Sequence, residues 1–181
     1  AKKLGYAEAD PTFDINGMDA AHKISILASL IYKIKSPLNN TYIEGIENIT
    51  TMDIEFAKEL GYCIKHVGIT NKKNNLIQCR VHPVLVHKDN ILSQVLGVMN
   101  ALQITGDKFG TSMLYGHGAG GDATASAVIT NLVEAINFSS GQDLRNKNIF
   151  KNSGIHSFDI TQNDDISSPF YLRIYALDIS G

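Results

Sequence analysis

The sequence predicts an α+β fold, in which a mixed, largely antiparallel sheet of about five strands carries helices packed on one face. Two stretches, residues 17–34 and 121–137, have apolar residues at spacings of three and four, which is typical of amphipathic helices. Between them lie runs rich in β-branched and aromatic residues, separated by short polar turns that favour antiparallel pairing. Helices of this kind bury their apolar faces against one side of such a sheet.

Local patterns predict the individual elements in chain order. They are a helix over 17–34, a strand over 41–46, a helix over 52–60, a β-hairpin over 62–69 and 76–82, a short helical turn over 91–95, strands over 97–104 and 109–115, and a helix over 121–137. Thr50 or Thr51 caps the second helix, and Gly61 ends it. The polar segment 71–75 is the predicted turn of the hairpin.

Length and composition indicate one sizeable domain followed by a short extra segment. The 181 residues are 44% hydrophobic, which is enough for a core. We expect residues 1–138 to form the domain and the polar residues 139–167 to form a linker. Residues 168–181 return to alternating apolar and polar character, which predicts a strand, and one strand cannot be a domain.

Composition also argues against several kinds of partner. The net charge is −2 and the basic residues are scattered, so we expect no nucleic-acid partner. The apolar run 24–32 is interrupted by serines and is too short to span a membrane. Cys63 and Cys79 fall on neighbouring strands of the predicted hairpin, where we expect small buried hydrophobes in a reduced, cytoplasmic setting. The histidines lack ligand spacing, so we expect no metal site.

Most of the candidate site residues lie in residues 5–23, GYAEADPTFDINGMDAAHK, where a turn leads into the first helix. This segment carries four acidic residues and a lysine: Glu8, Asp10, Asp14, Asp19 and Lys23. Asp14 or Asn16 can cap the helix, and Asp19 and Lys23 are four residues apart, so they share a face and can pair. Such a pair is ordinary on an exposed helix, but crowded carboxylates also need a cation, which Lys23 or a ligand ammonium would supply.

This segment resembles the substrate signature of homoserine dehydrogenases, a G-x-x-E turn followed by D-x-x-x-x-D-x-x-x-K. The resemblance implies reversible, NAD(P)-dependent interconversion of L-homoserine and L-aspartate 4-semialdehyde, a step in threonine, methionine and isoleucine biosynthesis. It implies that Glu8 and Asp19 hold the substrate, that Asp14 supports the catalytic polar network, and that Lys23 exchanges the proton at the substrate oxygen. Gly5 would let the backbone approach both substrate and cofactor.

A glycine-rich turn at residues 116–121 carries a second part of the resemblance. It follows the predicted strand GTSMLYG and opens the helix over 121–137, where backbone amides favour an anion. Alone this signal is weak, because no acidic residue about 20 positions later completes a dinucleotide-binding unit. The family has G-x-G-A-G followed by T-A-S-A-V here, which implies that Gly120 lies against the cofactor.

The resemblance further implies an enzyme larger than this chain. No strand-GxGxxG-helix pattern precedes residue 1, whereas the family's nucleotide-binding domain lies N-terminal to the signature. We therefore expect an excised middle piece, inactive alone, whose NAD(P) is bound mainly by that N-terminal domain. Residues 168–181 resemble the truncated start of an ACT-like regulatory domain, and similarity implies a homodimer.

Two alternatives stay open at this point. The first is a metal-dependent hydrolase in which the acidic residues bind magnesium or calcium, since both ions prefer oxygen ligands. The second is a non-catalytic module for amino-acid binding or dimerisation. The choice between NAD and NADP and the identity of an effector are also open.

Overall fold

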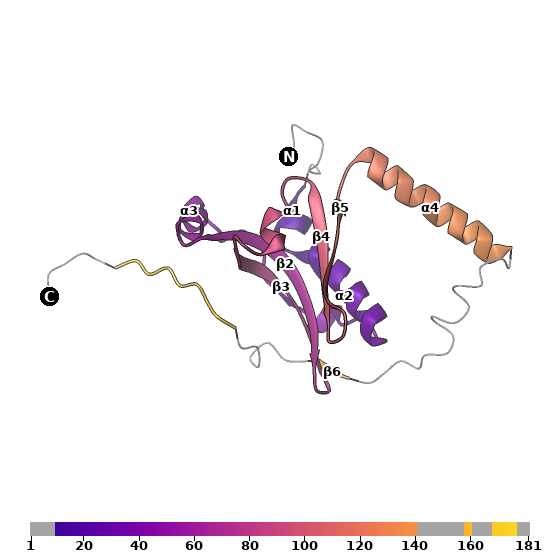
Figure 1. Ribbon diagram of the computed structural model, residues 1–181, viewed down its shortest axis with the longest axis horizontal. Helices are drawn as coiled ribbons and strands as arrows, with labels where there is room; N and C mark the ends of the chain where they lie inside the picture. The colour runs from indigo at the N-terminus through magenta and orange to yellow at the C-terminus, as the bar shows by residue number, and fades with distance from the viewer. Residues whose placement is uncertain (1–9, 141–157, 161–167, 177–181) are drawn as a thin grey trace.

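The computed structural model describes residues 10–140, 158–160 and 168–176, and its main elements are shown in Figure 1. In chain order they are α1 (Thr12–Ile15), α2 (Met18–Tyr32), η2 (Leu38–Asn40), β1 (Tyr42–Ile43), α3 (Thr51–Glu59), β2 (Tyr62–Lys73), β3 (Leu76–His87), η3 (Ile91–Gln94), β4 (Met99–Gly106), β5 (Gly110–His117), α4 (Gly121–Ser139) and β6 (Asp159–Ile160). Helices and largely antiparallel strands are both present, so the α+β class is confirmed.

The long β2–β3 hairpin forms the centre of the larger sheet. Its strands pair antiparallel from Tyr62 opposite His87 to Lys73 opposite Leu76, so only two residues connect them. Asn74 at that turn has φ +55°, a left-handed conformation that asparagine tolerates. The hairpin is confirmed, but its strands extend through most of the segment predicted as the turn. β1 and β6 both pair parallel with β3, which makes this sheet mixed.

Helix α2 packs against this sheet and forms the core with it. Ala21 and Ile24 cluster with Val81, while Ala28, one turn further along α2, clusters with Ile77 and Cys79 on β3. Gly68 on β2 has no side chain, and a Cβ there would lie 3.1 Å from the Cβ of Ile24. The close approach of α2 therefore depends on small residues on the helix and on the strand.

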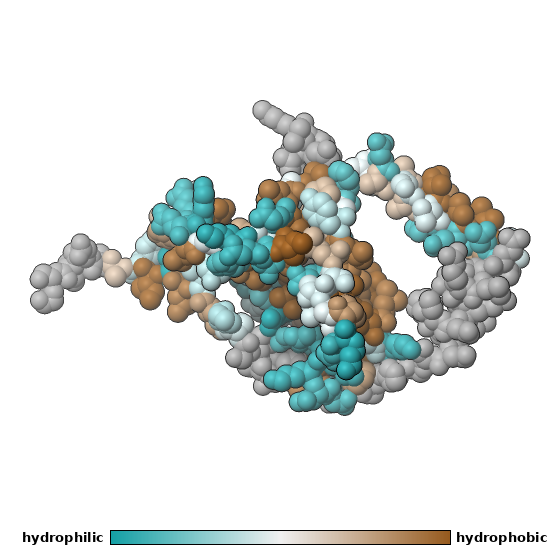
Figure 2. All heavy atoms as spheres, viewed as in Figure 1, coloured by the Kyte–Doolittle hydropathy of each residue, from teal (hydrophilic) through white to brown (hydrophobic). Residues whose placement is uncertain are grey.

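The remaining strands and helix α4 differ in detail from the prediction. β4 and β5 form a separate two-stranded sheet, so the predicted strands are divided between two sheets. α4 stands apart from both (Figure 1), and all its residues are exposed. Figure 2 shows hydrophobic side chains along it, and those at least half exposed include Val128, Ile129, Leu132, Val133, Ile136 and Phe138. Amphipathic spacing predicts that a helix has an apolar face, but it does not specify which element covers that face.

Of the two predicted caps of helix α3, Thr50 is the one found, and it forms a complete capping box with Asp53. The Thr50 hydroxyl accepts a hydrogen bond from the Asp53 backbone N–H at 3.3 Å, and the Asp53 carboxylate accepts one from the Thr50 backbone N–H at 2.8 Å. Two otherwise unpaired backbone donors are thereby satisfied. Gly61, with φ +82°, lies between this helix and β2.

We expect Thr50→Ala to lower the free energy of unfolding by about 1 kcal/mol, because the cap hydrogen bond is lost. Urea denaturation of the 181-residue chain measures this change. Thr50→Ser keeps the hydroxyl and should unfold close to the parent. Thr51→Ala removes the same side chain from the first helical residue, so equal losses for Thr50→Ala and Thr51→Ala would contradict the capping role.

The C-terminal part of the chain is described only in short pieces. Two parts of the predicted linker over 139–167 are described. Ser139 is the last residue of α4 and Ser140 is its C-cap, while residues 159–160 form β6 and pair with β3. Residues 168–176 form neither helix nor strand, so the strand predicted over 168–181 is wrong for these residues, which pair with none of the described strands. Residues 141–157, 161–167 and 177–181 lie outside the described part, so the linker and the ACT-like start stay predictions.

Candidate functional site

The first two helices are joined by Asn16 and Gly17, and we define residues 10–23 as the α1–α2 corner. Where the sequence predicts only a turn, α1 makes one short helical turn before α2 begins. Gly17 lies between them with φ +86°, a conformation that favours glycine. The N-cap residue of α2 is Gly17 and no side chain caps the helix, so the predicted cap at Asp14 or Asn16 is wrong. Asn16 still accepts a hydrogen bond at Oδ1 from the Met18 backbone N–H, at 3.0 Å.

The corner rests on the larger sheet through Gly17, which is buried. A Cβ at Gly17 would lie 3.0 Å from Cε1 of His66 and 3.2 Å from Cγ2 of Ile43. His66, on β2, contacts the backbone oxygen of Glu44 through Nε2 at 2.9 Å, which requires Nε2–H as the donor. Local sequence patterns do not identify His66, because it lies 49 positions after Gly17 and no local spacing links the two.

Asp19 and Lys23 form the predicted ion pair on the first turns of α2. Lys23 Nζ lies 2.5 Å from Asp19 Oδ2, and the side chains are 59% and 39% exposed, respectively. Solvent and a ligand can therefore reach both groups. The Lys23 ammonium has three donors, so the hydrogen bond to Asp19 leaves others open for a ligand.

The other two described acids of the corner have different surroundings. Asp14 is exposed on α1, and no hydrogen bond of its side chain is recorded within the described residues. Asp10 Oδ1 accepts hydrogen bonds from the hydroxyl of Thr12 at 2.5 Å and from its backbone N–H at 3.0 Å, and these bonds lower the pKa of Asp10. The rings of Phe13 and His22 stack with centroids 5.6 Å apart, which holds α1 against α2.

The predicted site residues are therefore only partly brought together. Asp19 and Lys23 are in contact, and Asp14 lies on the helix just before them. Gly5 and Glu8 fall outside the described residues. Within the described part of the chain, no three His, Cys, Asp or Glu side chains are grouped so that they could hold a metal ion, and Asp10 is engaged with Thr12. Nothing here supports the metal-dependent alternative.

The glycine turn before α4 offers a second candidate site. Gly120 is the N-cap residue of α4, with φ +124° and ψ 146°, a region essentially restricted to glycine. No side chain caps the helix there, and no heavy atom lies within 4 Å of a Cβ built on Gly120. Open backbone amides at a helix start suit an anionic group such as a phosphate. The turn is therefore compatible with a nucleotide cofactor.

The two cysteines are free and lie apart along the hairpin. Cys63 is opposite Val86, whereas Cys79 is opposite Thr70, whose hydroxyl oxygen lies 3.2 Å from the Cys79 sulfur. Burial raises the pKa of Cys79, so its thiol stays protonated, as expected for a small buried hydrophobe. Across the ranges that the structure describes, no helix is long and apolar enough to cross a membrane.

Several known proteins are similar to this chain in sequence and in fold. The profile of the homoserine dehydrogenase family matches residues 1–133. A homoserine dehydrogenase from Pseudomonas aeruginosa is 41% identical over 183 residues, covering 100% of this chain and 42% of that protein. The structure of a homoserine dehydrogenase from Thiobacillus denitrificans superposes with a TM-score of 0.80 at 41% identity, covering 90% of this chain and 38% of that one.

A more distant structural neighbour was solved with a cofactor. It is a hyperthermophilic archaeal homoserine dehydrogenase in complex with NADPH, with a TM-score of 0.59 and 32% identity, covering 75% of this chain and 38% of that one. The chain thus spans less than half the length of these relatives. The matched residues include the α1–α2 corner, the β2–β3 hairpin and the glycine turn, and on this agreement of sequence and fold the chain belongs to the homoserine dehydrogenase family.

Proposed function

We propose that this chain is the substrate-binding and catalytic unit of an NAD(P)-dependent homoserine dehydrogenase, which interconverts L-homoserine and L-aspartate 4-semialdehyde. The observation that carries the proposal is the accessible Asp19–Lys23 pair, with 2.5 Å between its charged groups. The pair forms the end of the signature, on helix α2, in the part of the chain that the family profile matches. This step belongs to threonine, methionine and isoleucine biosynthesis.

Each side chain has a role that suits its chemistry. The substrate carries an ammonium group, which Asp19 and Glu8 would bind as carboxylates. Reduction of the aldehyde leaves an alkoxide that needs a proton, and Lys23 would donate it, while in the reverse direction Lys23 would accept the hydroxyl proton. Asp14, on α1 next to the pair, would support the polar network. Asp19 contacts Lys23, so it would orient the lysine as well as bind the substrate.

The cofactor contacts of this chain would be made by glycine backbone. NAD(P) supplies or accepts the hydride. Gly120 would let the chain pass close to the cofactor, since the space beside its Cα is open and its conformation needs glycine. Gly5 would do the same at the start of the signature. The neighbour solved with NADPH supports a nicotinamide cofactor, and most of its binding surface would come from a separate nucleotide-binding domain.

The full-length enzyme would contain more than the described unit. We infer that the chain works together with an N-terminal nucleotide-binding domain, as a homodimer in the cytoplasm, and that residues 168–181 begin an ACT-like regulatory domain after the linker. The free cysteines are compatible with a reduced compartment. The 181 residues alone should have negligible dehydrogenase activity, because they lack most of the proposed cofactor site.

Substrate affinity tests the proposed roles of the carboxylates. In the full-length enzyme, we expect Glu8→Ala and Asp19→Asn to raise KM for homoserine roughly 10- to 100-fold, because each removes a charge-assisted bond to the ammonium. Steady-state kinetics at saturating cofactor measure this change. Glu55→Gln removes the same charge from an exposed position on α3 and should leave KM unchanged. A normal KM in both carboxylate variants would disprove the proposed substrate site.

A further inference from the structure

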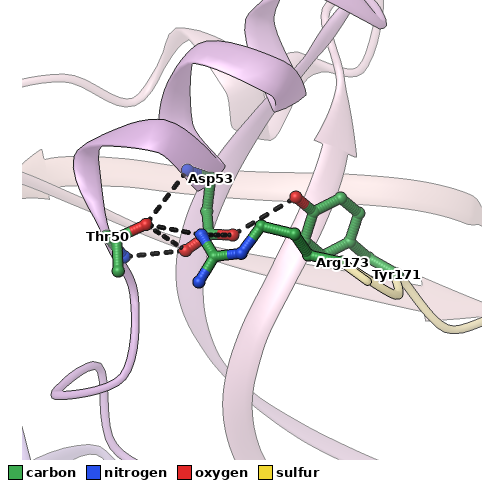
Figure 3. A network of polar contacts seen from close by, with 4 residues as sticks. All are labelled: Thr50, Asp53, Tyr171 and Arg173. Atoms are coloured by element: carbon green, nitrogen blue, oxygen red, sulfur yellow. Dashed lines mark hydrogen bonds and ion pairs between the residues drawn. The ribbon is translucent and has the colours of Figure 1, made fainter. Parts of the chain in front are cut away.

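The first turn of α3 is joined to a segment more than a hundred residues later in the chain (Figure 3). Asp53 Oδ2 accepts hydrogen bonds from the Thr50 backbone N–H at 2.8 Å and from the Thr50 hydroxyl at 2.6 Å. Its other oxygen, Oδ1, accepts from Arg173 Nη1 at 2.6 Å and from the Tyr171 hydroxyl at 3.2 Å. Arg173 Nη1 also donates to the Thr50 hydroxyl at 2.7 Å. We call Thr50 and Asp53 the socket.

The hydrogen bonds of the socket are complete only when Tyr171 and Arg173 are bound. A carboxylate accepts about four hydrogen bonds and a hydroxyl accepts two, and protein donors fill these positions in the socket. The side chains of Asp53 and Arg173 are 7% and 22% exposed, so their ion pair is largely removed from water. Removal of the Arg173 side chain while the segment stays in place would leave a nearly buried carboxylate without its counter-ion.

The charge on the socket is stable at neutral pH. Hydrogen bonds from the Thr50 side chain and backbone, followed by the nearby Arg173 guanidinium, hold the pKa of Asp53 below its usual value. The carboxylate therefore stays ionised. The Arg173 guanidinium lies 5.2 Å from the ring of Tyr175, a cation–π contact that orients it further.

Over residues 170–174, exposure differs between alternate side chains, as it would in an extended segment bound on one side, whereas Tyr175 is again 77% exposed. Phe170, Leu172 and Ile174 are 80%, 78% and 81% exposed, whereas Tyr171 and Arg173 contact the socket. Successive side chains of an extended chain point to opposite sides. Among the described residues, the hydrogen bonds recorded between this segment and the rest of the chain all end on the socket.

The socket is connected to the α1–α2 corner by packed elements. α3 packs on β2 and leads directly into it through Gly61. β2 carries His66, whose ring lies against Gly17 at the start of α2. The same helix carries Asp19 and Lys23 a short distance further along.

We propose that the socket on α3 is the docking site for the chain's own residues 168–176, and that seating Tyr171 and Arg173 there couples the C-terminal segment to the α1–α2 corner. The P. aeruginosa relative aligns with the whole chain, so this segment belongs to the shared sequence. The docking does not depend on the reaction proposed above. If another element bound the exposed apolar side of residues 168–176, the resulting shift of Tyr171 and Arg173 would be transmitted through α3 and β2 to Gly17.

NMR of the 181-residue chain tests docking and coupling separately from activity. In the parent, we expect backbone heteronuclear NOE values at residues 170–175 close to those of α2 and β2, because the segment is held in place. In Arg173→Gln they should fall to the values of freely moving chain. The amide shifts of Thr50 and Asp53 should change, and the changes should extend to His66 and Gly17.

Matched variants make the outcome specific. Lys108→Gln removes one positive charge from the exposed turn between β4 and β5, and it should leave all these signals unchanged. Tyr171→Phe removes only the hydroxyl, so the NOE values at residues 170–175 should fall less than in Arg173→Gln. Unchanged NOE values in Arg173→Gln would overturn the docking, and shift changes confined to the socket would overturn the coupling.

Discussion

In the full-length enzyme, Lys23→Ala is expected to lower kcat by about 10²- to 10⁴-fold, the range that a positioned acid or base contributes. KM for homoserine should change far less, because Glu8 and Asp19 still bind the substrate ammonium. Steady-state rates in both directions measure the effect. The reduction direction should lose the proton donor, and the oxidation direction should lose the base.

This loss would not result from unfolding. Lys23 and Asp19 are substantially exposed, and exposed helical pairs at this spacing contribute about 0.3 to 0.5 kcal/mol. The Lys23→Ala protein should therefore unfold at nearly the same urea concentration as the parent.

Two control variants separate proton transfer from charge. Lys23→Arg keeps a positive partner for Asp19, but a guanidinium does not release its proton readily, so kcat should stay low. Lys35→Ala removes an exposed lysine just beyond α2 and should leave kcat normal. A near-normal kcat in Lys23→Ala would refute the role given to this residue.

The second large effect is expected at Gly17, where α2 begins. Gly17→Val should lower the free energy of unfolding by about 3 kcal/mol, the sum of left-handed backbone strain and overpacking. The new side chain would meet the His66 ring at 3.0 Å and Ile43 at 3.2 Å. Urea denaturation of the 181-residue chain measures the loss.

Gly97 provides the matched control for backbone strain. It has φ +64°, but no atom lies within 4 Å of a Cβ built there. Gly97→Val should therefore cost only the strain, about 1 to 2 kcal/mol. If both variants lose equal stability, the contact between Gly17 and His66 does not hold the corner in place.

Local rules predicted the parts of the molecule that depend on near neighbours. The spacing of apolar residues identified α2, and the four-residue interval predicted the pairing of Asp19 with Lys23, which the structure confirms. The capping residue Thr50 and the hairpin were also recognised, because caps and tight turns are encoded within a few residues.

Contacts between distant residues were not predictable in this way. β1 is shorter than its pattern suggests because the backbone N–H of Ile46 donates to Ile15 O at the corner instead of continuing along β3. The contacts of Gly17 with His66 and of Asp53 with Arg173 join residues that share no periodic signal. Local patterns also could not predict that the apolar face of α4 is exposed, because the spacing of apolar residues does not identify the element that packs on them.

The β2–β3 hairpin also constrains the order in which the domain folds. Its strands are joined by two residues, so closing it costs little entropy, and hairpins form within about 1 to 10 μs. β1 pairs with the same strand through Tyr42 and Arg80, and the chain segment that this contact closes is far longer than the hairpin turn. We therefore expect the hairpin to nucleate folding. Helix α2 is synthesised before β3, yet it gains the surface that buries its apolar side only once β3 has been synthesised.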